Sequence, residues 1–137
     1  MKSKAVRLDH VGIAVKSIAE RLPFYRDVLG TSLLREEEIP TECVRVAMLD
    51  AGEAHVELLE PLAGEGPVAG FLRKRGEGIH HICFRVEDIG AALERARQAG
   101  LAVVGEAPRM GAGGCLVAFL HPRTSGGVLI ELSEKPR

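Results

Sequence analysis

The sequence predicts an α+β fold built from two tandem βαβββ modules whose strands form a curved mixed sheet. The chain repeats itself: a shift of 71 positions brings His10 onto His81 and the segment "VAML" onto "VAFL". Each copy also reads in the same order, as a short apolar strand, an amphipathic helix and three further strands. A repeat of this kind indicates the architecture before any single element is assigned.

The first module is predicted to span about residues 6–62. Its opening strand, "VGIAV", is followed by "SIAERLPFYRDVLG". Ser17, with Glu20 three residues later, is typical of a helix start, and Gly30 suits the helix end. Pro23 predicts a short first turn, a kink or a later start, because proline removes a helix hydrogen bond. The strands expected after this helix are "LLREE", "RVAMLD" and "HVELLE".

A linker helix is predicted over about residues 63–77 and the second module over about residues 78–134. The linker contains "GPVAGFLRKRGEG", in which Pro67 stands at the helix start, where proline is tolerated. In the second module Asp88 is expected to cap the helix "IGAALERARQAG", and Gly100 to end it. The strands that follow are "AVVGEA", "CLVAFLH" and "VLIELS".

Length and charge exclude several classes of function. Residues 1–137 are predicted to form one domain, because each module's sheet is too small to be stable without its twin. The 18 basic and 19 acidic residues leave a net charge of -1, which favours neither nucleic acid nor a membrane surface as a partner. The first ten residues lack the apolar core of a signal peptide, and no segment approaches the about 20 apolar residues of a membrane span. We therefore expect a cytoplasmic protein.

The cysteines point to the same compartment. Cys43, Cys83 and Cys115 are odd in number, far apart and in no C-x-x-C pattern. This spacing argues against a disulfide framework or a thiolate zinc site, so we expect reduced, buried thiols.

Two adjacent histidines open the apolar segment "GIHHICFRV". Neighbouring side chains of a strand point to opposite faces, so His80 and His81 are not expected to bind the same ion. The repeat separates them: His81 aligns with His10, whereas His80 aligns with Asp9. We therefore predict a ligand role for His81 and a supporting role for His80.

Two glutamates interrupt apolar strands at repeated positions. A shift of 74 positions aligns Glu57 of "VELLE" with Glu131 of "IELSE". A carboxylate inside an apolar strand is costly unless it is paired, hydrogen-bonded or bound to a metal. Together with the repeated histidines, these residues predict a site for a divalent ion such as Mn, Fe, Co, Ni or Zn, at the centre of the sheet.

The chain resembles the vicinal-oxygen-chelate (glyoxalase/bleomycin resistance/dioxygenase) superfamily. "DHVGIAV" and "FYRDVLG" are shared widely there, whereas "RGEGIHHICFRVEDI" and "HPRTSGGVLIEL" resemble its methylmalonyl-CoA epimerase branch. The resemblance implies a glyoxalase-like fold, an acyl-CoA substrate, a homodimer and a divalent metal, Co²⁺ first and Mn²⁺, Ni²⁺ or Zn²⁺ as alternatives. Its ligand positions fall on the four residues that the repeat selects: His10, Glu57, His81 and Glu131.

The resemblance also implies a reaction. Methylmalonyl-CoA carries an acidic proton on C2, and a metal would stabilise the enolate formed when that proton leaves. Glu131 is then both a ligand and the catalytic base. The position of a second glutamate, proposed as a base in one branch, falls on Val46, so Glu42, Cys43, His80 or a water held by the metal remain as alternatives.

Other residues and other activities stay open at this point. The basic residues 73–75 would either contact CoA phosphates or be solvated. The "GAGG" at 111–114 would either approach the thioester or form a plain turn. Arg85 would either meet a substrate carboxylate or be exposed. Met48 and Phe119 occupy equivalent positions and are expected to pack. Rival functions are glyoxalase I, which acts on a glutathione hemithioacetal, and a non-catalytic binding module; a ring-cleaving dioxygenase is disfavoured by the fourth ligand.

Overall fold

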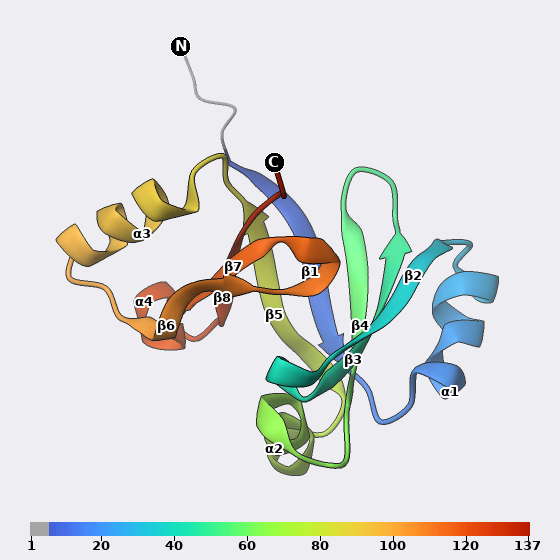
Figure 1. Cartoon of the computed structure of the whole chain (residues 1–137). Helices are drawn as coiled ribbons and strands as arrows, with labels where there is room; N and C mark the ends of the chain where they lie inside the picture. The colour runs from blue at the N-terminus through green and yellow to red at the C-terminus, as the bar shows by residue number, and fades with distance from the viewer. Residues whose placement is uncertain (1–5) are drawn as a thin grey trace. The chain divides into compact units, whose positions relative to one another are not determined.

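The computed structural model describes residues 6–137, with the side chains of residues 106 and 107 left out (Figure 1). The described chain divides into two compact units, one of residues 10–80 and one of residues 6–9 with 81–137. The expectation about a signal peptide rests partly on residues 1–5, which lie outside the described residues. No helix of the described part is long and apolar enough to cross a membrane.

The helices and strands together make the α+β fold class that the sequence predicts. The first half contains β1 (Arg7–Ala14), α1 (Ile18–Leu22), the π-helical turn η1 (Pro23–Val28), β2 (Ser32–Ile39), η2 (Pro40–Glu42), β3 (Val44–Asp50), β4 (His55–Pro61) and α2 (Gly66–Arg75). The second half contains β5 (Gly78–Arg85), α3 (Ile89–Gln98), β6 (Val103–Met110), η3 (Ala112–Gly114), β7 (Leu116–Leu120), α4 (Pro122–Ser125) and β8 (Ile130–Glu134).

The same strand topology occurs twice. In the first unit the order is β2-β3-β4-β1, and β1 runs parallel to β4 while the other neighbours are antiparallel. In the second unit the order is β5-β8-β7-β6, and β5 runs parallel to β8. The registers correspond as well, because Gly12 lies opposite Glu57 and Cys83 lies opposite Glu131. Each unit is therefore a mixed sheet with one parallel pair, which confirms the repeat.

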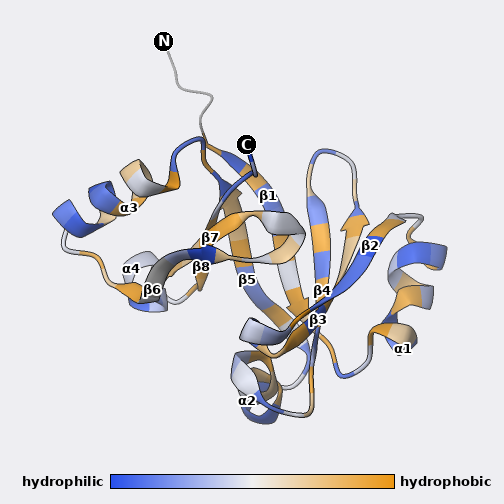
Figure 2. Cartoon of the chain, in the orientation of Figure 1, coloured by the Kyte–Doolittle hydropathy of each residue, from blue (hydrophilic) through white to orange (hydrophobic). Residues whose placement is uncertain are grey.

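One face of each sheet packs against the helix of its own unit. The first core is made by Val15, Ile18, Leu22, Ala47, Leu49 and Leu58, and the second by Val86, Ile89, Ala92, Leu93, Ala118 and Leu132. Figure 2 shows apolar and polar residues alternating along the strands. Because neighbouring residues of a strand face opposite ways, Glu57 and Glu131 lie on the sheet faces that these helices do not cover.

Helix α1 is short because of Pro23. Its start is capped by Ser17, whose Oγ accepts a hydrogen bond from the Glu20 backbone at 3.2 Å. The regular helix ends at Leu22, and the π-helical turn that follows begins with Pro23, which cannot donate a backbone hydrogen bond. Gly30, at a φ of 85°, closes the turn. Of the three alternatives that Pro23 predicted, a short first turn, a kink or a later start, the structure has the short first turn.

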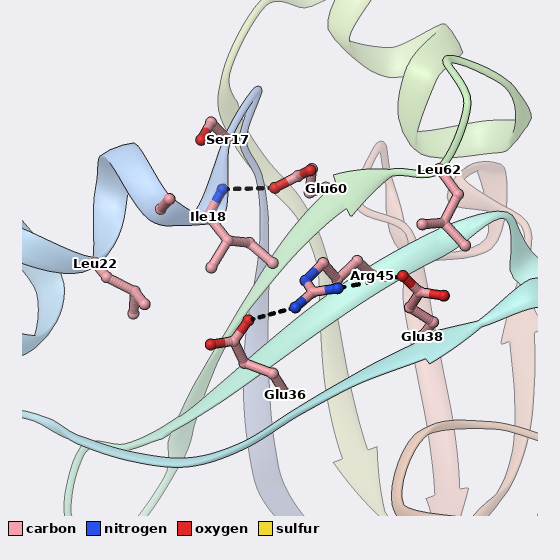
Figure 3. A pocket seen from close by; sticks show the side chains of 9 residues that line it. Ser17, Ile18, Leu22, Glu36, Glu38, Arg45, Glu60 and Leu62 are labelled. Atoms are coloured by element: carbon pink, nitrogen blue, oxygen red, sulfur yellow. Dashed lines mark hydrogen bonds and ion pairs between the residues drawn. The ribbon is translucent and has the colours of Figure 1, made fainter.

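Each helix is also anchored by a glutamate from the last strand of its unit. Glu60 of β4 accepts a hydrogen bond from the Ile18 backbone at 2.8 Å, as Figure 3 shows, and Glu134 of β8 accepts one from the Ile89 backbone at 2.9 Å. In α3, Asp88 adds the predicted cap by accepting from the Ala91 backbone at 3.0 Å. Carboxylates at helix N-termini satisfy free N–H groups and favour the helix dipole.

Three single-turn helices were missed: η2, η3 and α4. A helical turn of three or four residues is too short to show an apolar periodicity. Only its capping residues and prolines can indicate it in the sequence. In α4, His121 is the cap, and its Nδ1 accepts from the Arg123 backbone at 3.0 Å. The linker helix is present as α2, with Pro67 in its first turn. The module boundaries themselves stay a prediction.

Candidate active site

His10 and Glu57 form a buried pair in the first unit. His10 lies on β1 and Glu57 on β4, and each is only about 5% exposed. The distance from His10 Nε2 to Glu57 Oε1 is 3.2 Å. Register explains the contact, because Gly12, two residues after His10, lies directly opposite Glu57. With no side chain on Gly12, the carboxylate has room to reach the imidazole.

His81 and Glu131 form the corresponding pair in the second unit. His81 lies on β5 and Glu131 on β8, and the distance from His81 Nε2 to Glu131 Oε1 is 3.0 Å. Both residues are buried. Phe119 of β7 lies opposite Glu131 in the register, and its ring meets the His81 ring edge-on at 5.7 Å between centroids. The histidine is thus held between a carboxylate and an aromatic ring.

The donor atoms of both pairs suit a divalent ion. Each pair offers one imidazole nitrogen and one carboxylate oxygen, the set that first-row transition metals and zinc accept. A buried carboxylate next to a neutral imidazole keeps part of its desolvation penalty, which a cation would remove. The residues present therefore fit a metal, and their role as ligands remains a prediction.

The chain is similar in sequence and in structure to known proteins. The sequence pattern described as Glyoxalase/Bleomycin resistance protein/Dioxygenase superfamily matches residues 9–119, which is most of the chain. The chain belongs to this superfamily. Its fold is the glyoxalase-like α+β fold, whose class the repeat predicted and whose glyoxalase-like form the resemblance implied.

Similar members of the superfamily are epimerases, which are isomerases. The Ethylmalonyl-CoA/methylmalonyl-CoA epimerase of Cereibacter sphaeroides is 42% identical over 130 residues, covering 93% of this chain and 97% of the relative. The crystal structure of methylmalonyl-CoA epimerase from Mycobacterium tuberculosis matches with a TM-score of 0.93 and 38% identity, covering 100% of this chain and 94% of that one.

A second solved structure contains a bound CoA compound. A variant of Streptomyces coelicolor methylmalonyl-CoA epimerase, in complex with 2-nitronate-propionyl-CoA, matches with a TM-score of 0.91 and 36% identity, covering 98% of this chain and 100% of that one. Together these matches confirm the resemblance to the epimerase branch of the superfamily.

His80 packs against the linker helix α2. Its ring packs against Phe71 of α2, edge-on at 5.1 Å between centroids. The Arg75 guanidinium lies 5.7 Å from the centroid of the same Phe71 ring, so one residue of the predicted basic run contacts an aromatic side chain. The supporting role expected for His80 agrees with this packing against the linker helix.

The position where the superfamily resemblance puts a second base is apolar here. Val46 is buried at 1% exposure and carries no titratable group. Glu37, however, lies directly opposite Val46 on β2, half-buried and paired with Arg35 at 3.1 Å. A carboxylate therefore stands on the neighbouring strand. Among the sequence alternatives, Cys43 is held at a φ of 56°, in the left-handed region that residues other than glycine rarely occupy.

The second unit carries further polar residues on the face of Glu131. Arg85 is neither exposed nor unpaired, since its Nε lies 3.4 Å from Asp9 Oδ1. The Cys83 thiol donates a hydrogen bond to Ser133 Oγ at 3.3 Å, and Cys83 lies opposite Glu131 in the β5–β8 register. Cys83 is buried as expected, whereas Cys43 and Cys115 are only half-buried, so the expectation of buried thiols is wrong for these two. The "GAGG" segment forms the turn η3, in which the Gly111 N–H donates to the Cys115 carbonyl at 2.8 Å.

Sequence reasoning missed Arg109 on this face. Arg109 of β6 lies opposite Val117, two residues before Phe119 on β7, and its guanidinium carbon is 5.8 Å from the Phe119 ring centroid. The alternation of β7 would have placed Val117 and Phe119 on one face. The residue opposite Arg109 could not be predicted from the sequence, because the β6–β7 register shifts between Val104 and Arg109.

A separate cavity of about 370 Å³ lies beside α1, on the other face of the first sheet (Figure 3). Arg45 crosses it and pairs with Glu36 and Glu38, both at 3.2 Å. Because Arg45 lies opposite Glu60 and Met48 lies opposite Glu57, the cavity and the His10–Glu57 pair occupy different faces. The cavity therefore does not contain the candidate ligands.

Proposed function

We propose that this chain interconverts (2R)- and (2S)-methylmalonyl-CoA. The observation that carries the proposal is the pair of buried histidine–glutamate contacts, repeated at equivalent positions of two units. The proposal is supported by relatives named as methylmalonyl-CoA epimerases, which match the chain nearly end to end. Support for a CoA thioester as substrate comes from the relative solved with 2-nitronate-propionyl-CoA.

The ligand set in this proposal is His10, Glu57, His81 and Glu131, acting together on one divalent ion. Co²⁺ is the first choice, and Mn²⁺, Ni²⁺ or Zn²⁺ are alternatives within the same donor chemistry. When bound, the ion supplies positive charge where negative charge develops on the substrate oxygens. The superfamily and the repeated burial of these four side chains support the assignment.

Glu131 is proposed as the base that takes the C2 proton. Its side chain is largely excluded from water and lies beside His81, so its carboxylate is held in place by a neighbouring ring rather than by solvent. A carboxylate already fixed in place accepts the proton without first having to be oriented. Return of a proton to the opposite face of the planar carbon inverts the centre.

The test is stereochemical. A single diastereomer of methylmalonyl-CoA is incubated with the protein in the presence of Co²⁺, and the two diastereomers are separated by chromatography. We expect conversion to an equal mixture, and its loss after metal is removed with a chelator. A diastereomer that stays unchanged with each of Co²⁺, Mn²⁺, Ni²⁺ and Zn²⁺ would overturn the proposal.

The same preparation distinguishes the rival glyoxalase reaction. Glyoxalase I converts a glutathione hemithioacetal through similar proton chemistry, so ligand identity alone does not separate the two enzymes. Formation of S-lactoylglutathione without epimerisation would move the function to the rival. Binding of either thioester with neither reaction would instead support the non-catalytic module.

Assembly as a homodimer in the cytoplasm completes the proposal. The dimer is supported by exposed apolar side chains along η1, where Phe24, Val28 and Leu29 are at least half exposed. The cytoplasm is supported by the three free cysteines, because oxidising compartments favour disulfides. Light scattering coupled to size-exclusion chromatography should give twice the chain mass.

A further inference from the structure

Apolar side chains lie beside Glu57 on the sheet face that carries the His10–Glu57 pair. In the β3–β4 register Met48 is directly opposite Glu57, and Val46 is directly opposite Leu59. Directly opposite residues of two antiparallel strands point to the same face, and so do residues two apart on one strand. Val46, Met48 and Leu59 therefore form an apolar strip on the face of Glu57.

The apolar strip is buried, but it is not part of the core under α1. Its three side chains are 1%, 4% and 5% exposed, in chain order. The core that packs against α1 contains the intervening residues of the same strands, Ala47, Leu49 and Leu58, which point to the other face. The strip therefore belongs to the side of the sheet that carries the candidate ligands of the first unit.

The chemistry of the substrate requires an apolar surface near the reacting carbon. Methylmalonyl-CoA has a carboxylate and a thioester whose oxygens suit a cation, and a proton on C2 that suits a base. The remaining substituent of C2 is a methyl group, which forms no hydrogen bond and is stabilised only by contact with apolar atoms. In the first unit, the apolar strip supplies such atoms next to a proposed ligand.

Met48 is the member of the strip that best fits a contact with this methyl group. It is the residue directly opposite Glu57 on β3. Its unbranched side chain has three rotatable bonds and adapts to the shape of its neighbours, whereas the β-branched Val46 is restricted at χ1. The methyl group changes its position relative to the other substituents when C2 inverts, so an adaptable neighbour suits both diastereomers.

The corresponding position of the second unit holds a more rigid side chain. Phe119 lies opposite Glu131 in the β7–β8 register, as Met48 lies opposite Glu57. The Phe119 ring meets the His81 ring edge-on at 5.7 Å between centroids, and the Arg109 guanidinium carbon lies 5.8 Å from its centroid. A ring with neighbours at its edge and over its face yields little space. The repeat therefore leaves the adaptable side chain to the first unit.

We propose that Met48 contacts the C2 substituent of the substrate and determines the size of substituent that the site accepts. The proposal rests on the function proposed above, and it leaves the substrate carboxylate to the metal ion. A shorter side chain at this position makes room for a longer substituent. One methylene group in an apolar pocket changes specificity by about 10- to 200-fold, so a single residue has a measurable effect.

The experiment compares two thioesters that differ by one methylene at C2, methylmalonyl-CoA and ethylmalonyl-CoA. Epimerisation of each by the Co²⁺-loaded protein gives its kcat/KM, and the ratio of the ethyl to the methyl value is the readout. In Met48→Ala we expect this ratio to rise by about 10-fold or more. A general loss of active protein lowers both values equally and leaves the ratio unchanged.

Three further variants serve as controls. Met48→Leu nearly keeps the side-chain volume and should leave the ratio close to that of the wild type. Leu49→Val shortens the next residue of β3, which is 0% exposed in the core on the other face, and should also leave the ratio unchanged. Met48→Val should raise the ratio by less than Met48→Ala, and it provides the test if Met48→Ala does not fold.

Several results would overturn the proposal. An unchanged ratio in Met48→Ala, with an active wild type, contradicts the inference and leaves the proposed function standing. A ratio that rises equally in Leu49→Val would show a general loosening of the sheet instead of a contact with the substrate. A rise in Phe119→Leu without one in Met48→Ala would move the contact to the second unit. Failure of the wild type to epimerise either thioester would overturn both the inference and the proposed function.

Discussion

At the scale of single residues, the main feature is the contact between a buried histidine and a buried glutamate in each unit. Glu57 and Glu131 stand in strands that otherwise bury apolar side chains, and an ionised carboxylate there costs several kcal/mol unless a partner compensates. His10 and His81 supply that partner at 3.2 and 3.0 Å. Removing one member of a pair therefore leaves the other buried without its partner.

The adjacent histidines provide the first test at this scale. His81→Ala should lose Co²⁺ binding by about 10-fold or more, because one predicted ligand is gone. His80→Ala should keep it, since His80 packs on Phe71 instead. Visible absorption of the Co²⁺ protein measures both. Equal loss in the two variants would contradict the assignment of the histidines.

The two glutamates differ in their expected chemistry. Glu131→Gln should reduce C2 proton exchange by about 100-fold or more, because an amide does not accept the proton as a base. Glu57→Gln retains an oxygen ligand and should reduce exchange far less. Rates of the two variants, compared at saturating Co²⁺, measure the difference. Near-normal exchange in Glu131→Gln would refute its role as the base.

At the scale of helices and strands, a glutamate of a strand binds the backbone at the start of a helix in each unit. Glu134 accepts hydrogen bonds from the Ile89 backbone and from Arg137, and these contacts lower the pKa of its carboxyl below the usual value. The folded-state pKa is lower than the unfolded one, so the carboxylate stabilises the fold above about pH 4.3. That stabilisation is lost as the pH falls through the folded-state pKa.

Glu134→Gln should accordingly show a pH-dependent cost. At pH 7 the variant should melt at a lower temperature than the wild type, and the difference should shrink as the pH is lowered towards 3. Thermal melts followed by circular dichroism at several pH values test this expectation. The control, Glu94→Gln, changes an exposed carboxylate on α3 and should show little difference at any pH. A pH-independent difference for Glu134→Gln would contradict the electrostatic explanation.

The elements also show which features were readable from sequence. The caps at Ser17 and Asp88 and the interruption at Pro23 were predicted, because each depends on residues a few positions apart. The anchors were not, since the Ile89–Glu134 contact depends on where β8 lies beside α3. Arg85–Asp9 and Arg109–Phe119 likewise depend on strand register, which local patterns do not reveal. The histidines and glutamates could be selected from the sequence without knowing the strand register, because the repeat places them at equivalent positions.

At the scale of the whole molecule, the repeat gives each unit one histidine–glutamate pair at an equivalent strand position. The superfamily assignment supports use of both pairs for one ion. The proposed site predicts a stoichiometry of one Co²⁺ per chain, measured by calorimetry and elemental analysis. Two ions per chain of equal affinity would show that each pair binds separately.

Metal binding should also stabilise the folded chain. An ion that binds only the native state stabilises it by about 2.7 kcal/mol at a concentration 100 times its Kd. Wild-type protein should therefore melt at a higher temperature with Co²⁺, and the Glu57→Ala/Glu131→Ala double variant should not. An equal shift in both proteins would indicate binding elsewhere.

Deuterium exchange at C2 of methylmalonyl-CoA in heavy water tests the central claim most directly, because it reports proton removal without requiring a particular product. Mass spectrometry follows the label with the metal-free protein and after addition of Co²⁺. The account predicts rapid incorporation of one deuteron at C2 with Co²⁺ and background incorporation without it. Absence of Co²⁺-dependent incorporation, together with turnover of the glutathione hemithioacetal by the same preparation, would contradict it.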